Sequence, residues 1–228
     1  MRVPFYFLIA GLTLGCQPAR AQIPPSTQEI LRYLGLHSAA NKGDVAEIEK
    51  LARSGADREA RDGNDRTPLH VATFLKRREA IRALIRVGAK TDAFDRQKYD
   101  AVTIASVADD TETLRLLLDA GASAKLITSV YEGTALIAAA HLGHDEVVRL
   151  LIKAGAPLDH VNNLGWTAVI EAIVLGNGGP RHQATLRHLI AASANLNLAD
   201  RQARTPLAHA RAYGHAAMAD MLIAAGAQ

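Results

Sequence analysis

The sequence predicts an all-α solenoid of about six stacked helix-turn-helix units with short β-hairpin fingers. Two observations carry this prediction. The dipeptide Gly-Ala recurs at a fixed spacing, and an apolar segment with helical periodicity precedes each copy. The first four copies begin at Gly55, Gly88, Gly121 and Gly155, in steps of 33, 33 and 34 residues, and a last one begins at Gly226. This period is typical of stacked repeats, in which each unit packs on its neighbours.

Each repeat contains a recognisable helix start. Residues 67–70 read Thr-Pro-Leu-His, where Thr can cap free N–H groups and Pro suits the first helical position. The third repeat has Asp100 at this place, and Asp100 is its predicted cap. A Gly or polar residue such as Gly143 ends the first helix, and a second helix follows with apolar residues at helical spacing, as in residues 147–151. Gly-Ala ends the second helix, and a polar stretch such as residues 57–66 predicts a hairpin-like finger.

This pattern resembles the ankyrin repeat, whose signature is Thr-Pro-Leu-His-x-Ala followed by Gly-His and a Leu-rich second helix. Residues 67–72 match the signature, and Gly143-His144 and Gly214-His215 match the turn between helices. The resemblance covers about residues 34–228. The expected repeats are 34–60, 61–93, 94–127, 128–160, 161–198 and 199–228. The finger glycine of the family survives only as Gly165; its counterparts are Asp65, Lys98, Glu132 and Ala203.

Residues 1–21 are typical of an export signal. A basic second residue precedes an apolar run at residues 5–14, and a small-x-small cleavage site ends at Ala21. The run is too short to span a bilayer, so we expect no transmembrane segment in the mature chain. Cleavage would leave residues 22–33 as an N-terminal arm and the protein periplasmic or secreted. The alternative is a membrane-anchored lipoprotein, modified at Cys16.

Composition and motifs exclude several function classes. Of the 228 residues, 49% are hydrophobic and 4% aromatic, and the net charge is +3. Without the two arginines of the leader, 24 basic residues face 23 acidic ones, a net charge of +1, so we expect no nucleic-acid partner. The sequence contains no Gly-x-Ser-x-Gly and no convincing Ser, His and Asp order, so we expect no enzyme and no cofactor.

The resemblance implies where a partner binds. In ankyrin repeat proteins the short helices and finger tips line a concave groove, at the residue before each Thr and at the seventh and eighth residues after it. These positions are largely apolar or aromatic in this chain, which is typical of protein interfaces. The candidate partner-binding residues are Arg66, Phe74, Leu75, Tyr99, Tyr131, His141, Trp166, Leu175, Arg204 and Tyr213, with Arg181 on the insertion described next.

The fifth repeat is five residues longer, at residues 177–181 between its two helices. Three interpretations stay open: a turn without a role, a lip that contacts a partner through Arg181 and His182, and a phosphate cradle. The stretch is similar to an exported bacterial ankyrin family, which implies a binding role. Packing of the candidate side chains against their own neighbours also stays open as an alternative to partner binding.

The predicted function is that of a protein–protein interaction module of the bacterial periplasm. We expect it to bind a partner protein or peptide in the groove, and we favour a monomer over an oligomer. The alternative is a small-ligand or metal-binding protein that uses His141, His144, Arg181 and His182. Because histidines at the Leu-His and Gly-His places of this family typically hydrogen-bond to backbone between repeats, we expect no metal site.

Overall fold

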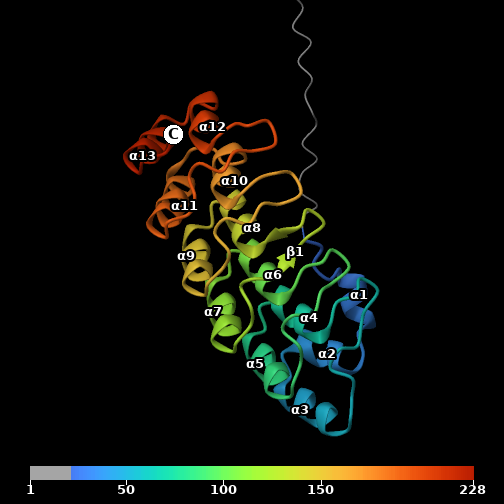
Figure 1. Ribbon diagram of the computed structural model, residues 1–228. Coiled ribbons are helices and arrows are strands. Elements are labelled where there is room, and N and C mark those ends of the chain that lie inside the picture. Colours follow the sequence, from blue (N-terminus) through green and yellow to red (C-terminus); the bar gives the residue numbers. More distant parts are fainter. Residues whose placement is uncertain (1–21) are drawn as a thin grey trace, which may run out of the picture.

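The computed structural model describes residues 22–228, so the predicted leader with Cys16 lies outside the described residues. The helices form two parallel rows that stack into a solenoid (Figure 1), which confirms the predicted fold class. The inner row contains α2 (Gly35–Lys42), α4 (Pro68–Phe74), α6 (Ala101–Val107), α8 (Ala135–Leu142), α10 (Ala168–Val174) and α12 (Pro206–Ala212). The outer row contains α3 (Val45–Arg53), α5 (Arg78–Arg86), α7 (Thr111–Asp119), α9 (Asp145–Lys153), α11 (Pro180–Ala191) and α13 (Ala216–Ala224).

The inner helices begin where the sequence predicts, because a side-chain oxygen caps each start. Thr67 Oγ1 accepts a hydrogen bond from the N–H of His70 at 3.4 Å, and Thr134, Thr167 and Thr205 cap their helices in the same way. Asp100 replaces Thr in the third repeat and caps α6 through the N–H of Thr103 at 3.0 Å. The carboxylate of Asp100 therefore caps α6 in place of the missing Thr-Pro pair.

The core lies between the two rows and repeats with the same period as Gly-Ala. One leucine in each of the last five outer helices is fully buried, four residues before the closing Gly or Ser: Leu84, Leu117, Leu151, Leu189 and Leu222. Small residues such as Ala72, Ala105 and Ala172 face them from the inner row and are also buried. Alanine has little side-chain volume, so neighbouring helices can approach closely.

The fingers keep one backbone shape although four of them lack the family glycine. Asp65, Lys98, Glu132 and Ala203 all adopt the left-handed conformation, with φ between 54° and 61°, as Gly165 does at 85°. In four fingers an Asp or Asn also accepts hydrogen bonds from two finger N–H groups; Asp62, for example, binds the N–H of Asn64 at 2.8 Å and of Arg66 at 3.0 Å. These side chains fix the turn that glycine otherwise favours.

The finger before α8 differs because it is one residue longer. Thr134 follows Gly121 by 13 residues, whereas Thr67 follows Gly55 by 12, which locates the single 34-residue step between the first four Gly-Ala copies. The extra residue widens the loop, and β1 (Ile127–Thr128) and β2 (Gly133–Thr134) pair as an antiparallel hairpin. Within the described residues, this is the one finger with regular strands.

The insertion in the fifth repeat lengthens a helix as well as a loop. Pro180 is the first residue of α11, which has 12 residues where α9 has nine, so Pro180 and Arg181 belong to the helix rather than to a free loop. The remaining turn is tight: Gly178 has φ +65°, and a Cβ at this position would lie 2.4 Å from Nδ1 of His215. Glycine is required here by both backbone conformation and space.

The segment before the repeats contains a helix that the repeat pattern does not predict. Residues 27–32 form α1 (Thr27–Arg32), which Ser26 and Glu29 start with a reciprocal capping box. Pro25 is buried against the repeats. The residues predicted as an arm therefore pack on the first fingers.

Candidate partner-binding face

The finger tips form one continuous edge of the solenoid. Backbone hydrogen bonds join neighbouring fingers: Arg96 N–H donates to the carbonyl of Asn64 at 3.0 Å, Ser129 N–H to that of Lys98 at 2.9 Å, and Asn163 N–H to that of Tyr131 at 2.9 Å. Side chains at equivalent positions of the first four fingers are therefore neighbours in space.

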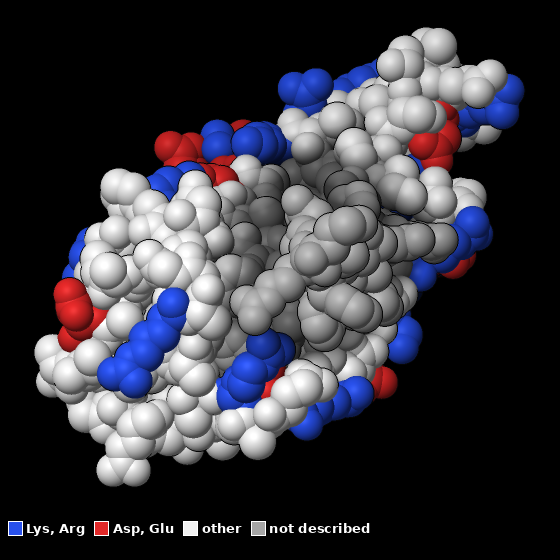
Figure 2. Space-filling view, turned by 90° about the horizontal axis from the view of Figure 1, so that it is seen from above, with Lys and Arg blue, Asp and Glu red and all other residues white. Residues whose placement is uncertain are grey.

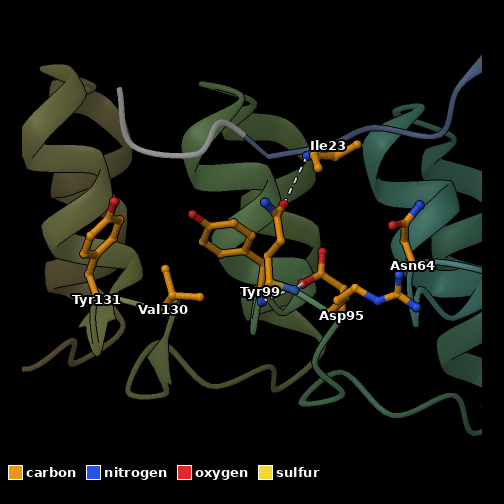
Figure 3. A pocket seen from close by; sticks show the side chains of 8 residues that line it. Ile23, Asn64, Asp95, Tyr99, Val130 and Tyr131 are labelled. Atoms are coloured by element: carbon orange, nitrogen blue, oxygen red, sulfur yellow. Dashed lines mark hydrogen bonds between the residues drawn. The ribbon is translucent and has the colours of Figure 1, made fainter. Parts of the chain in front are cut away.

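A pocket of about 380 Å³ opens on this edge between the second and third of these fingers. Its lining combines the tyrosines Tyr99 and Tyr131, the exposed Val130, and polar groups from the neighbouring finger (Figure 3). We call it the finger pocket; the complete lining is Ile23, Asn64, Asp95, Arg96, Gln97, Tyr99, Val130 and Tyr131. An apolar wall with a few polar groups is the usual lining of a binding site.

The other candidate residues spread along the face. Tyr213 is 51% exposed at the end of α12, where its ring stacks on His215 at 6.0 Å, and Arg204 is exposed in the last finger and pairs with Asp200. Half-buried candidates are Phe74, Leu75, His141, Trp166 and Leu175. Of the eleven candidates, the finger pocket brings together Tyr99 and Tyr131.

The prediction that Arg66 binds a partner is wrong. Its side chain has no exposed surface: it donates to Asp62 Oδ2 at 2.7 Å, to the carboxylate of Glu29 in α1, and to the carbonyl of Ile23 at 3.1 Å. Tyr33 completes the cluster through its hydroxyl, which donates to Asp62 Oδ2 at 2.6 Å. Arg66 holds the N-terminal segment to the first finger.

The electrostatics of this cluster favour the charged forms. Burial by itself raises the pKa of Asp62, but hydrogen bonds from Tyr33 and from the backbone N–H of Arg66 bring that pKa below its usual value. Glu29 behaves similarly, with hydrogen bonds from Ser26 outweighing burial, so its pKa is also lowered. Burial opposes the charge of Arg66, yet the hydrogen bond with Asp62 raises its pKa overall.

The insertion does not present a free lip of Arg181 and His182. Arg181 bridges to Asp109 at 2.8 Å and to Asp145 at 3.2 Å, so it ties together the third, fourth and fifth repeats. Nε2 of His182 lies 3.0 Å from the carbonyl oxygen of His141. The phosphate cradle stays untested, and the rings of His182 and His215 lie close to Gly176 and Gly178.

Three histidines hydrogen-bond between repeats as predicted. His37 Nε2 lies 2.9 Å from the carbonyl of Arg66, His70 Nε2 lies 3.1 Å from that of Tyr99, and His144 Nδ1 lies 3.0 Å from that of Ser106. In residues 22–228, no three His, Cys, Asp or Glu side chains are placed where they could share a metal ion.

Sequence reasoning missed a row of exposed aliphatic and aromatic side chains at the finger tips. In three successive fingers an exposed apolar residue comes directly before Asp95, Thr128 or Asn162. These apolar residues are Phe94, Ile127 and Val161, with 39%, 55% and 48% of their surface exposed. Two residues after Thr128 and Asn162 lie Val130 and Leu164, at 53% and 43%. The register contains the signal, because the matching positions in the first finger are Arg61 and Asn64, which are polar. We call these five residues the tip row.

Charge is mixed on one face of the molecule (Figure 2). On the face seen in Figure 2, Lys and Arg lie in small separate groups among Asp, Glu and uncharged residues rather than in one basic stripe. In the part of the chain that the structure describes, no helix is sufficiently long and apolar to cross a membrane.

Comparison with known proteins gives a consistent result. A family model described as ankyrin repeats (3 copies) matches residues 36–128 and 105–179. The chain is 32% identical over 190 residues to the ankyrin repeat protein YahD of Escherichia coli (strain K12), covering 83% of this chain and 94% of YahD. A crystal structure of an ankyrin repeat domain from Acinetobacter baumannii AYE superposes with a TM-score of 0.80 and 42% identity over 85% of this chain and 98% of that one. The ankyrin repeat domain of Bcl-3 gives a TM-score of 0.78 and 26% identity over 86% and 88%. The chain belongs to the ankyrin repeat family.

Proposed function

We propose that this protein is a protein–protein interaction module and that its finger edge and concave face bind a partner protein or peptide. Ankyrin repeats generally mediate protein–protein interaction, and ankyrin repeat proteins are generally non-enzymatic scaffolds. The observation that carries the proposal is the tip row, in which large apolar side chains recur at matching positions of consecutive fingers. Clustered exposed apolar side chains mark interaction sites, whereas isolated ones are ordinary.

The test uses the full chain as bait for partner capture and compares two variants. Val161→Asp with Leu164→Asp places two charges in the tip row. Ile223→Asp is the matched control, because Ile223 is 49% exposed but lies on α13 in the outer row. We expect the double variant to lose the captured partner and the control to retain it, with both folded by circular dichroism. Equal recovery with both variants contradicts the proposal.

The cellular setting is also part of the proposal: the chain acts in the bacterial periplasm, as a monomer. The export-type leader and the similarity to proteins of Escherichia coli and Acinetobacter baumannii support the setting. Expression in a bacterial host, followed by fractionation and intact mass measurement, tests it. We expect a periplasmic product that begins at Gln22. A product lipidated at Cys16 replaces this setting with a membrane anchor, and an unprocessed cytoplasmic product refutes export. Light scattering measures the oligomeric state.

The small-ligand alternative has less support. Arg181, His182 and His144 already bind groups of their own chain. His141 Nδ1 lies 3.2 Å from Glu171, which is buried. These side chains stabilise contacts between repeats, and together they do not make a free ligand set.

A further inference from the structure

The chain places its own residues 22–26 across the fingers beside the finger pocket. The Gln22 side chain donates to the carbonyl of Thr103 in α6 at 3.1 Å, and Ile23 N–H donates to Oε1 of Gln97 at 3.3 Å. The Ile23 carbonyl accepts from Arg66 at 3.1 Å. Figure 3 shows Ile23 on one side of the pocket and Tyr99, Val130 and Tyr131 on the other.

The chemistry of this segment suits an extended bound peptide. Its sequence is Gln-Ile-Pro-Pro-Ser. A residue that precedes proline is restricted to extended or polyproline conformations, which applies here to Ile23 and Pro24. Such a backbone makes no internal hydrogen bonds, so its polar groups need outside partners. Gln97 and Arg66 supply them for Ile23, and the two prolines have no N–H to satisfy.

The segment fills the site incompletely. Ile23 keeps 52% of its surface exposed although it lines the pocket, and Val130 opposite keeps 53%. The pocket volume of about 380 Å³ remains open between them. Pro25, in contrast, is buried. Pro25 is thus held well, whereas Ile23 and Pro24 both keep exposed surface.

We propose that the finger pocket is a binding site for an extended peptide in which an aliphatic residue precedes two prolines, and that residues 22–26 are its resident, displaceable occupant. Aromatic-lined grooves recognise proline-rich segments because these are already extended before they bind. Tyr99 and Tyr131 form such a lining, and Oε1 of Gln97 accepts a hydrogen bond from the backbone N–H of the aliphatic residue. A partner's segment that buries its aliphatic side chain against Val130 replaces the chain's own.

This inference rests on the proposed function and narrows it to one peptide class and one place. The two can fail separately, because the capture experiment changes Val161 and Leu164, whereas the experiment below changes Ile23, Pro25 and Val130. Loss of peptide binding with partner capture intact refutes only the present inference.

The probe is the acetylated and amidated peptide Gln-Ile-Pro-Pro-Ser, titrated to about 1 mM and followed by amide chemical shifts. The full chain is compared with its Ile23→Asp, Pro25→Gly variant, in which the resident segment is loosened. We expect shifts at residues 95–99 and 129–131 in both proteins, with an apparent Kd at least tenfold lower in the loosened variant. The same peptide with Asp in place of Ile should produce no shifts.

Matched substitutions complete the test. In each background, Val130→Asp should weaken peptide binding at least tenfold, whereas Ile223→Asp should leave it unchanged, since Ile223 on α13 is 49% exposed but does not line the pocket. Equal Kd values in the full chain and the loosened variant, equal effects of the two substitutions, or no shifts in the full chain each overturn the proposal. If the loosened variant does not fold, the titrations of the full chain with Val130→Asp and Ile223→Asp still decide it.

Discussion

Acid should destabilise the second repeat through His70, a buried residue of α4. The His70 ring is held as one neutral tautomer: Nδ1 accepts from the N–H of Thr67 at 3.0 Å, and Nε2, 3.1 Å from the carbonyl of Tyr99, must therefore donate. Burial lowers its pKa from 6.5 to about 4, although the hydrogen bond to Tyr99 acts in the opposite direction. A proton on Nδ1 would remove the acceptor of Thr67 N–H.

The size of the effect follows from the two pKa values. The unfolded chain takes up a proton at His70 below pH 6.5, whereas the folded chain does so only near pH 4. Stability from the neutral ring is therefore complete above pH 6.5 and is lost as the pH falls to about 4. One pKa unit corresponds to about 1.4 kcal/mol, so the loss is about 2 kcal/mol at pH 5 and about 3 kcal/mol below pH 4.

Urea unfolding at pH 7, 6 and 5, followed by circular dichroism, measures this effect in the full chain and in His70→Gln. The variant loses hydrogen bonds and starts less stable, but its stability should depend less on pH by about 2 kcal/mol across this range. Acids whose pKa is lowered, such as Glu146 at about 2, respond below this window. The same pH dependence in both proteins, or a His70 titration near pH 6.5 by NMR, refutes the reasoning.

Three further predictions concern side chains that hold repeats together. Arg66→Ala leaves the carboxylates of Asp62 and Glu29 without their cation, so it should reduce the free energy of unfolding by about 3 kcal/mol. Arg204 occupies the same repeat position but is 52% exposed, so Arg204→Ala should change that free energy by less than about 0.5 kcal/mol. Arg181→Ala, at 53% exposure, should cost less than about 1 kcal/mol, and the cost should shrink in high salt; a larger, salt-independent loss argues against this. Gly178→Ala should cost about 2 kcal/mol because it combines a left-handed backbone with the clash against His215, and Gly88→Ala, left-handed in open space, about 1 kcal/mol. Thermal and urea unfolding measure all three, and equal losses for the two glycine variants contradict the steric part.

The repeat period carried most of the fold prediction, because capping, periodicity and glycine turns are local. Asp100 could be predicted as a cap since its side chain acts on its own helix start. The 34-residue step shows that one repeat has an extra residue, but the Gly-Ala spacing does not show whether that residue lies in the finger or between the two helices. The left-handed conformation of Lys98 and Glu132 could not be predicted, since neither residue type favours it.

The site was predicted less well because it depends on contacts distant in sequence. Arg66 is 37 residues from Glu29, and residues 22–33 carry no repeat signature that would place them against the first finger. Arg181 is 72 residues from Asp109. The tip row, in contrast, could have been found: comparison of Arg61 with Phe94, Ile127 and Val161 shows a polar position that turns apolar in consecutive copies.

The long finger before α8 shows how such an array can diversify. One added residue there is absorbed by β1 and β2, while the caps and buried leucines on either side keep their places. The length of a finger loop can thus change without changing how the helices stack. New recognition surfaces can arise by inserting residues into single fingers, without the compensating changes in the core that an insertion within a helix would demand, and residues 129–132 are a natural position at which to graft a designed binding loop.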